Sequence, residues 1–246
     1  MKTIYNKGGI RLINGETVST LTKLARDGEQ FDAMLTDPPY ASGGLHIGSK
    51  SQSTTTKYQQ TQTKKLFPSF GGDARSQLSW LTWCTVWLNA SREILKPGAP
   101  VMMFCDWRQA AAAIQAVQAG GFQYRGLVPW DKGNGRPYPG GFRAQCEYII
   151  FATNGKIQNK EVYMPGVFRE PIPSRKVRRH ATQKPIPLLT DLLKIVPEGG
   201  KVLDAFAGSG TTLHACRQRG LKGTAIEESR VIAADACAWL KEPVAT

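Results

Sequence analysis

The chain has 246 residues, which is enough for one α/β domain with a buried core and too few for two large domains. Hydrophobic residues make up 41% and charged residues 21%, as in ordinary soluble globular proteins. The 32 basic and 19 acidic residues give a net charge of +13, which favours a polyanionic partner because neutralised phosphates release counterions. A basic surface without such a partner is the alternative.

The five cysteines are scattered and form no C-x-x-C pair, which argues against a disulfide framework and against a zinc site. The first residues lack the apolar stretch of a signal peptide. No apolar run approaches the ~18 residues of a membrane span. We therefore expect a cytoplasmic protein that binds neither a metal nor a membrane.

Predicted strands and helices alternate along the chain. Residues 31–36 form an apolar strand that stops at two prolines, and residues 77–95 form a helix that stops at Lys96-Pro97-Gly98. The remaining predicted strands are 101–105, 122–130, 147–153, 201–205 and 222–226, and the remaining helices are 107–119, 185–196, 211–219 and 231–240. A Gly/Pro-rich hinge, GNGRPYPGG, separates two of these strands. Such alternation implies βαβ units, a mostly parallel sheet and one domain over residues 1–246.

Two irregular stretches carry most of the excess positive charge. Residues 41–72 are rich in Ser, Thr, Gln and Gly and contain four lysines and no acidic residue. Residues 156–184 contain eight basic and two acidic residues. The low hydrophobicity of the first stretch predicts a long loop. Positive charge therefore concentrates in loops, where it can contact phosphates; solvated loops without a ligand are the alternative.

A glycine-rich turn, DAFAGSGTT at residues 204–212, lies between a predicted strand and a predicted helix. Its glycines allow a tight approach to a ligand, and the helix start offers free N–H groups. Glu227 ends the next strand, where a carboxylate can accept hydrogen bonds from both hydroxyls of a ribose. The turn lacks G-K-[ST] and the third glycine of a dinucleotide fingerprint. It predicts an adenosine-containing cofactor held by Asp204, Ala205, Phe206, Gly208, Gly210, Thr211, Thr212 and Glu227; a turn that binds nothing is the alternative.

A second turn, Asp37-Pro38-Pro39-Tyr40, follows the first predicted strand. Its prolines fix the backbone and remove two N–H donors. If the Asp37 carboxylate and the Pro38 carbonyl each accept one N–H of a base amine, the nitrogen lone pair can attack a methyl group on a sulfonium. Tyr40 would stack on the base, which must leave the duplex. A strand-terminating Asx turn is the structural alternative.

Together these motifs resemble the DNA amino-methyltransferases, which modify adenine N6 or cytosine N4, and specifically the β group with permuted motif order. The catalytic turn precedes the cofactor turn, as in that group. The matching segments are DPPY at 37–40, LKPGAPVMMF at 95–104, VPWDK at 128–132, EYIIFAT at 147–153, HATQKP at 180–185, DAFAGSGTT at 204–212 and AIEES at 225–229.

The resemblance implies a Rossmann-like α/β fold with a seven-stranded sheet, mostly parallel with one antiparallel strand. It places both turns at the carboxyl ends of adjacent central strands. The implied cofactor is S-adenosyl-L-methionine, with His180, Thr182, Lys184 and Pro185 near its methionine end. A plain helix start is the alternative for Lys184-Pro185. The segment Asn14-Gly15-Glu16 resembles the family's segment near the cofactor adenine, although the family more often has Asp where Glu16 stands.

The resemblance also places the target-recognition region at residues 154–179, and the loop 41–72 would face DNA as well. The short recognition region suggests a short or relaxed target sequence. The side chains expected to contact DNA are Lys50, Lys57, Lys64, Lys65, Arg169, Arg175, Lys176, Arg178 and Arg179.

Asp37 at the first position of its turn favours adenine N6, because cytosine-N4 enzymes more often carry Ser there. The expected function is methylation of a flipped adenine in double-stranded DNA. The alternatives are a cytosine-N4 enzyme, an RNA or protein-glutamine methyltransferase, and a DNA-binding protein that has lost the chemistry. A homodimer and a cognate restriction nuclease are partners to consider.

Overall fold

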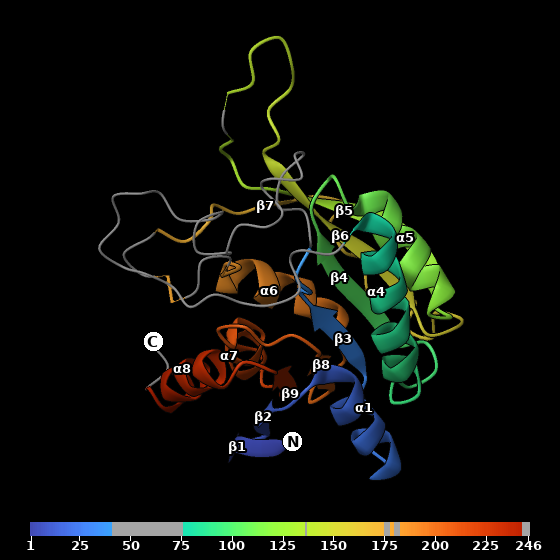
Figure 1. The fold of residues 1–246 in the computed structure, drawn as a ribbon, viewed down its shortest axis with the longest axis vertical. Helices are drawn as coiled ribbons and strands as arrows, with labels where there is room; N and C mark the ends of the chain where they lie inside the picture. Colours follow the sequence, from blue (N-terminus) through green and yellow to red (C-terminus); the bar gives the residue numbers. More distant parts are fainter. Residues whose placement is uncertain (41–75, 136, 175–177, 180–182, 243–246) are drawn as a thin grey trace.

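The structure is a computed structural model that describes residues 1–40, 76–135, 137–174, 178–179 and 183–242. These residues build one nine-stranded sheet with the order β1-β2-β9-β8-β3-β4-β6-β5-β7 (Figure 1). The strands are β1 (Lys2–Lys7), β2 (Ile10–Asn14), β3 (Ala33–Thr36), β4 (Pro100–Cys105), β5 (Gln123–Asp131), β6 (Cys146–Thr153), β7 (Phe168–Arg169), β8 (Lys201–Asp204) and β9 (Lys222–Glu227).

The helices cover both faces of this sheet. They are α1 (Thr17–Arg26), α4 (Gln77–Arg92), α5 (Ala110–Ala119), α6 (Ile186–Leu192), α7 (Thr211–Gln218) and α8 (Arg230–Lys241), with a 3₁₀ turn, η1 (Leu193–Ile195), after α6. One apolar cluster joins α1, α4 and α5 to the sheet, and the other joins α6, α7 and α8 to the opposite face. Because both faces are covered, the central strands β3 and β4 are apolar along almost their whole length and buried.

The predicted α/β class and mostly parallel sheet are confirmed, but the predicted count of seven strands with one antiparallel member is wrong. The inner seven strands, from β2 to β5, do contain a single antiparallel strand, β6. Two edge strands extend them, β1 by an antiparallel hairpin and β7 by two residues paired with β5. The hairpin turn uses Gly8 and Gly9, whose φ angles of 60° and 77° suit a two-residue turn with a left-handed backbone.

Helix boundaries depart from the predicted ones for local reasons. The second predicted helix begins at Ala110 rather than at residue 107, because the Asp106 carboxylate accepts the backbone N–H groups of Arg108 and Gln109 at 3.0 and 3.1 Å. Helix α4 begins where the Ser76 hydroxyl caps the Ser79 N–H at 3.2 Å. It buries Trp80, Cys84, Trp87 and Leu88, a spacing that forms one helical stripe.

One edge of the sheet collects the functional loops. Strands β2, β9, β8, β3 and β4 are parallel neighbours, and β5 points the same way because it is separated from β4 by the antiparallel β6. The loops that follow β3, β8, β9, β4 and β5 therefore leave from the same carboxyl edge. Ligands of open α/β sheets bind at that edge.

None of the helices in the described part of the chain is both long and apolar enough to span a bilayer.

Candidate active site

The two predicted turns leave the sheet side by side. Strands β3 and β8 pair in parallel, with Ala33 opposite Val202 and Met34 opposite Leu203. The Thr36 hydroxyl donates to Oδ1 of Asp204 at 2.9 Å and thereby links the end of one strand to the end of the other. The juxtaposition that the resemblance implies is therefore present in the structure.

The glycine-rich turn holds an open, left-handed backbone. Gly208 and Gly210 have φ angles of 50° and 84°, a region that side chains other than glycine rarely adopt. A methyl group added at Gly208 would meet no atom within 4 Å, so the turn faces open space at this point. The Asp204 carboxylate accepts the Phe206 N–H at 3.0 Å and shapes the turn from inside. These features suit the close approach of a ligand to the backbone.

Glu227 lies at the end of β9, next to this turn. Its Oε2 accepts the Gly208 N–H at 2.9 Å and its Oε1 accepts the Ser229 N–H at 2.8 Å. Burial raises the pKa of Glu227 to about 7, and burial likewise raises the pKa of Asp204 to about 6. A carboxylate held by backbone donors beside an open glycine turn fits the ribose of an adenosine-containing cofactor.

The Asn14-Gly15-Glu16 segment borders the same corner of the site. The Asn14 side-chain amide donates to the carbonyls of Glu227 and Glu228 at 2.8 and 3.0 Å. Glu16 instead caps α1, where its carboxylate accepts the N–H groups of Val18 and Ser19, both at 2.8 Å. Asn14 therefore helps to position Glu227, whereas the Glu16 carboxylate is engaged by its own helix.

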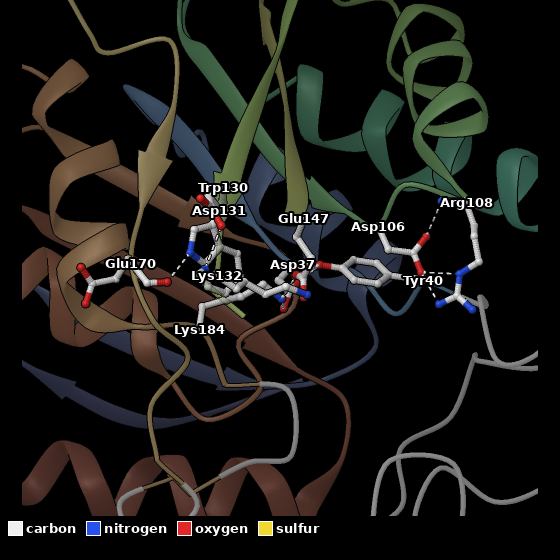
Figure 2. A network of polar contacts seen from close by, with 11 residues as sticks. Asp37, Tyr40, Asp106, Arg108, Trp130, Asp131, Lys132, Glu147, Glu170 and Lys184 are labelled. Carbon is white, nitrogen blue, oxygen red and sulfur yellow. Dashed lines mark hydrogen bonds and ion pairs between the residues drawn. The ribbon is translucent and has the colours of Figure 1, made fainter. Parts of the chain in front are cut away.

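The Asp-Pro-Pro-Tyr turn is fixed from three directions. The Tyr40 hydroxyl donates to Asp37 Oδ1 at 2.6 Å, and the Lys184 ammonium donates to Asp37 Oδ2 at 2.5 Å (Figure 2). The Trp80 indole N–H donates to the Pro39 carbonyl at 2.6 Å. The Lys184 side chain is 6% exposed and the Asp37 side chain is 26% exposed, so the ion pair is largely buried. Lys184, predicted to lie near the cofactor, thus contacts the catalytic turn, and its cofactor contact stays a prediction.

Glu147, at the start of β6, completes a network that sequence reasoning missed. Its carboxylate lies 3.4 Å from the Lys184 ammonium and 3.3 Å from the Lys132 ammonium. The Tyr40 hydroxyl also lies 3.3 Å from Glu147 Oε2. The sequence signal that could have identified Glu147 is a charged residue at the start of a strongly apolar predicted strand. Glu147 and Lys132 also stand in segments that carry the family resemblance, without a role assigned to either.

The network distributes charge unevenly between its two acids. Burial raises the pKa of Asp37, aided by Glu147 and opposed by Lys184. Burial also acts on Glu147, but Lys184 and Lys132 outweigh it and lower the pKa of Glu147. The two carboxylates in turn raise the pKa of Lys184 despite its burial. The Lys184 ammonium therefore opposes the effect of burial on the pKa of Asp37 without outweighing it.

A cavity of about 280 Å³ opens beside the network. Tyr40, Lys132, Glu147 and Lys184 line it on the catalytic side. The remaining lining residues are Asp106, Trp107, Arg108, Trp130, Ala144, Cys146, Ile172, Arg178 and Gln183. The site thus combines aromatic surfaces with hydrogen-bonding groups, as pockets for planar polar ligands do.

Some of the residues predicted to contact DNA or the cofactor are described in the structure, and the others are not. Among those described, Arg178 lines the cavity, the exposed Arg169 pairs with Asp131 at 3.0 Å, and Arg179 pairs with Glu242 at 2.6 Å. Pro185, predicted near the cofactor, is buried and precedes α6. Lys50, Lys57, Lys64, Lys65, Arg175, Lys176, His180 and Thr182 lie outside the described residues.

None of the five cysteines, all of which lie in the described part of the chain, forms a disulfide bond. Within the described ranges, no group of three or more His, Cys, Asp or Glu side chains could hold a metal ion.

Comparison with known proteins connects this geometry to one family. The profile of the DNA methylase family of N6 and N4 enzymes matches residues 31–236. The type II methyltransferase M2.DpnII of Streptococcus pneumoniae is 24% identical over 253 residues, covering 93% of this chain and 88% of that protein. The M1.HpyAVI–SAM complex has a TM-score of 0.69 at 19% identity, covering 95% of this chain and 100% of that one. The PvuII cytosine-N4-specific DNA methyltransferase has a TM-score of 0.67 at 13% identity, covering 95% and 86%.

The family match extends over most of the chain and includes both turns, Glu147 and Lys184. The expected DNA amino-methyltransferase family is thereby confirmed. The chain belongs to the N6/N4 DNA methylases, enzymes that transfer a methyl group from S-adenosylmethionine to an exocyclic amine of a DNA base.

Proposed function

We propose that the protein methylates the N6 amine of adenine in double-stranded DNA. The observation that carries this proposal is the position of the Asp37 carboxylate, at the end of β3, linked through Thr36 to the Asp204 turn. A base amine at Asp37 would therefore lie beside the cofactor turn. Methyl transfer needs that proximity, because an in-line displacement occurs between atoms held in contact.

The cofactor side of the site is assigned to the turn from Asp204 to Thr212 and to Glu227. The Glu227 carboxylate would accept hydrogen bonds from the ribose hydroxyls, and the open face of Gly208 would admit the ligand. When bound, S-adenosylmethionine supplies an electrophilic methyl group on a sulfonium. The chain's own contribution is to hold that group at the edge of the sheet where Asp37 stands.

The base side of the site is assigned to Asp37, the Pro38 carbonyl and Tyr40. Asp37 and Pro38 would each accept one N–H of the amine, which concentrates electron density on its nitrogen. The Asp37 carboxylate is oriented for this by Tyr40 and Lys184 at 2.6 and 2.5 Å. The cavity beside Tyr40 and Trp107 would receive the base once it has left the duplex.

The choice of adenine over cytosine depends on Asp37, since cytosine-N4 enzymes of this family more often begin their turn with Ser. The fold by itself accommodates either base, because the cytosine-N4-specific PvuII enzyme shares it at a TM-score of 0.67. Cytosine-N4 methylation is therefore the runner-up function.

The test is to identify the product. Unmethylated genomic DNA is incubated with the protein and methyl-labelled S-adenosylmethionine, digested to nucleosides and separated by chromatography. We expect labelled N6-methyladenine, lost with Asp37→Ala and kept with Asp27→Ala, which removes an exposed carboxylate at the C-cap of α1 that pairs with Lys23. Cofactor binding by calorimetry should be equal in all three proteins. Labelled N4-methylcytosine would replace the proposal by its runner-up, and label in neither base would refute it.

Two further partners belong to the proposal. A homodimer would appear as a doubled mass in sedimentation equilibrium, and a cognate restriction nuclease would cleave the sites that this protein protects. The first relative named above is a type II methyltransferase.

A further inference from the structure

The loop between β5 and β6 forms a long projection at the carboxyl edge of the sheet. Figure 1 shows it extending beyond the strands in yellow-green. Sequence reasoning treated this Gly/Pro-rich segment as a hinge and placed DNA recognition at residues 41–72 and 154–179. The described parts of the projection are residues 132–135 and 137–145, and we refer to them as the β5–β6 hairpin.

The base of the β5–β6 hairpin is firmly attached to the sheet. The Asp131 carboxylate accepts the Gly133 N–H at 2.8 Å and the Gln145 amide at 2.9 Å. The Lys132 N–H donates to the Gln145 carbonyl at 3.1 Å. These bonds join the two sides of the hairpin where it leaves β5 and β6, so its direction is set by the sheet.

The tip of the hairpin is a tight turn that displays two aromatic rings. The Gly141 N–H donates to the Tyr138 carbonyl at 3.1 Å, and Gly140 has a φ of 72°, which fits a type II turn with Pro139 before it. A side chain at Gly141 would overlap the Tyr138 ring, which therefore lies against the glycine backbone. Phe142 is 99% exposed and Tyr138 is 69% exposed.

The hairpin rises from the rim of the catalytic cavity. Lys132, Ala144 and Cys146, at the two feet of the hairpin, line the same cavity as Tyr40 and Glu147. A duplex that delivers a base into this cavity must therefore lie against the hairpin. Arg143 stands next to Phe142 and adds a positive charge suited to the phosphate backbone.

We propose that the β5–β6 hairpin enters the DNA at the target site and that Phe142 stacks in the gap left by the extruded base. The inference rests on the proposed function in requiring a base in the catalytic cavity, and it holds for adenine or cytosine alike. A single exposed aromatic is common on protein surfaces. A hydrogen-bonded turn that presents a fully exposed ring, on a hairpin whose feet line the cavity, is better explained by a stacking partner.

The energetic cost of base extrusion favours an aromatic ring in the gap that the base leaves. Extruding a base leaves its neighbours without a stacking partner and costs a few kcal/mol. Apolar side chains inserted between base steps offset such costs in proteins that deform DNA. An aromatic ring stacks on any base, so the contact requires no particular sequence. Phe142 would thus lower the cost of extrusion without reading the target.

The experiment compares three unmethylated substrates that each contain one copy of the target site. The site is first mapped by sequencing genomic DNA that the wild-type protein has modified. The substrates are the paired duplex, the same duplex with an abasic nucleotide opposite the target, and the single strand. We expect Phe142→Ala to lower kcat/KM about 5- to 150-fold on the paired duplex, the range of one lost stacking contact. On the other two substrates the loss should be within about twofold, because there extrusion costs little.

Matched variants separate stacking from other roles. Phe142→Trp should retain wild-type kcat/KM, and Val86→Ala, which trims a 50% exposed apolar side chain on α4, should behave as wild type on all substrates. A loss of equal size on all three substrates, or no loss on the paired duplex, would overturn the proposal. So would a dissociation of dimers by Phe142→Ala in sedimentation, which would assign the ring to a second copy. If the wild-type protein methylates no DNA, the proposed function itself has failed.

Discussion

Two pairs of acids stand at the same edge of the sheet in different electrostatic environments. Asp37 and Glu147 share the Lys184 ammonium, at 2.5 and 3.4 Å. Asp204 and Glu227 are held in the described structure by neutral donors. Asp204 accepts hydrogen bonds from the Thr36 and Thr212 hydroxyls and from the Phe206 N–H. Glu227 accepts two backbone N–H groups. Burial raises the pKa of Asp204 to about 6 and that of Glu227 to about 7.

The catalytic pair, Asp37 and Glu147, is already neutralised by a cation in the free protein. The cofactor-side pair, Asp204 and Glu227, has no cationic partner among the described residues before a ligand binds. The Lys184 network fixes the Asp37 carboxylate before any base arrives, so little reorganisation is left for the reaction. Buried acids without a cationic partner lower the stability of the fold, and groups retained at such a cost cluster at functional sites. The catalytic pair is therefore expected to tolerate the loss of Lys184 poorly, whereas the fold should gain when a cofactor-side acid is neutralised.

Removing Lys184 should have the largest effect. Lys184→Met leaves Asp37 and Glu147 buried without their shared cation, so the free energy of unfolding should fall by about 3 kcal/mol. Methylation at neutral pH should fall about 100-fold or more, because Asp37 loses its charge and orientation. Denaturant titration and single-turnover rates measure the two effects.

A readout specific to the network is the pH dependence of kcat/KM. Loss of Lys184 raises the pKa of Asp37 further, so the acid limb of the profile should move to higher pH. Lys194→Met is the control, since it breaks an exposed pair with Asp191, and should change stability by less than about 1 kcal/mol. An unmoved acid limb would show that Lys184 does not govern the ionisation of Asp37.

Glu227→Gln should act on the cofactor. It replaces a charged acceptor by a neutral one, so the dissociation constant for S-adenosylmethionine should rise about 10- to 100-fold in calorimetry at pH 8. Glu228→Gln changes the exposed neighbouring residue and serves as the control. Equal affinities for the Glu227→Gln and Glu228→Gln proteins would exclude Glu227 from the cofactor site.

The same variant should change how the stability of the free protein depends on pH. The folded protein binds the Glu227 proton more tightly than the unfolded chain does, because its pKa is about 7 against an ordinary value of 4.5. The stability contributed by this group is thus highest at low pH and declines as the pH rises from about 4.5 to 7. Glu227→Gln removes the titrating carboxyl, so this decline, worth on the order of 2 kcal/mol after allowance for partial exposure, should be absent from the variant. The amide oxygen can replace only one of the two carboxylate oxygens that accept backbone N–H groups, so the variant should lose some stability at every pH. A decline in stability between pH 4.5 and 7 that is as large in the variant as in the wild type would contradict this sign.

The sequence predicted what local patterns encode. The turns at residues 37–40 and 204–212 were identified because prolines and glycines mark them directly, and the six strands from β9 to β5 in the sheet order because most of them are apolar and buried. Strands β1, β2 and β7 and helix α1 were missed. For the two edge strands the reason is the opposite one. Strand β1 is largely exposed and polar, and β7 has two residues, so neither carries a hydrophobic pattern.

The network around Lys184 could not be predicted from the sequence, because its residues are far apart along the chain and come into contact only in the folded protein. Lys184 and Asp37 are 147 residues apart and Tyr40 and Glu147 are 107 residues apart. The contacts arise where the antiparallel β6 returns Glu147 to the carboxyl edge. A lysine before a helix start gave no indication that its ammonium would lie between two acids.

The smallest predicted effect concerns the hydroxyl that joins the two regions. Thr36→Val keeps the shape of a side chain that is 1% exposed but removes its 2.9 Å hydrogen bond to Asp204. The free energy of unfolding at pH 8 should fall by about 1 kcal/mol. The loss should shrink below pH 6, where Asp204 is protonated and binds the hydroxyl less strongly. Thr85→Val, which removes a 3.0 Å bond within α4, should show no such pH dependence. If both variants respond alike to pH, Thr36 supports the fold generally and does not couple the two turns through the Asp204 charge.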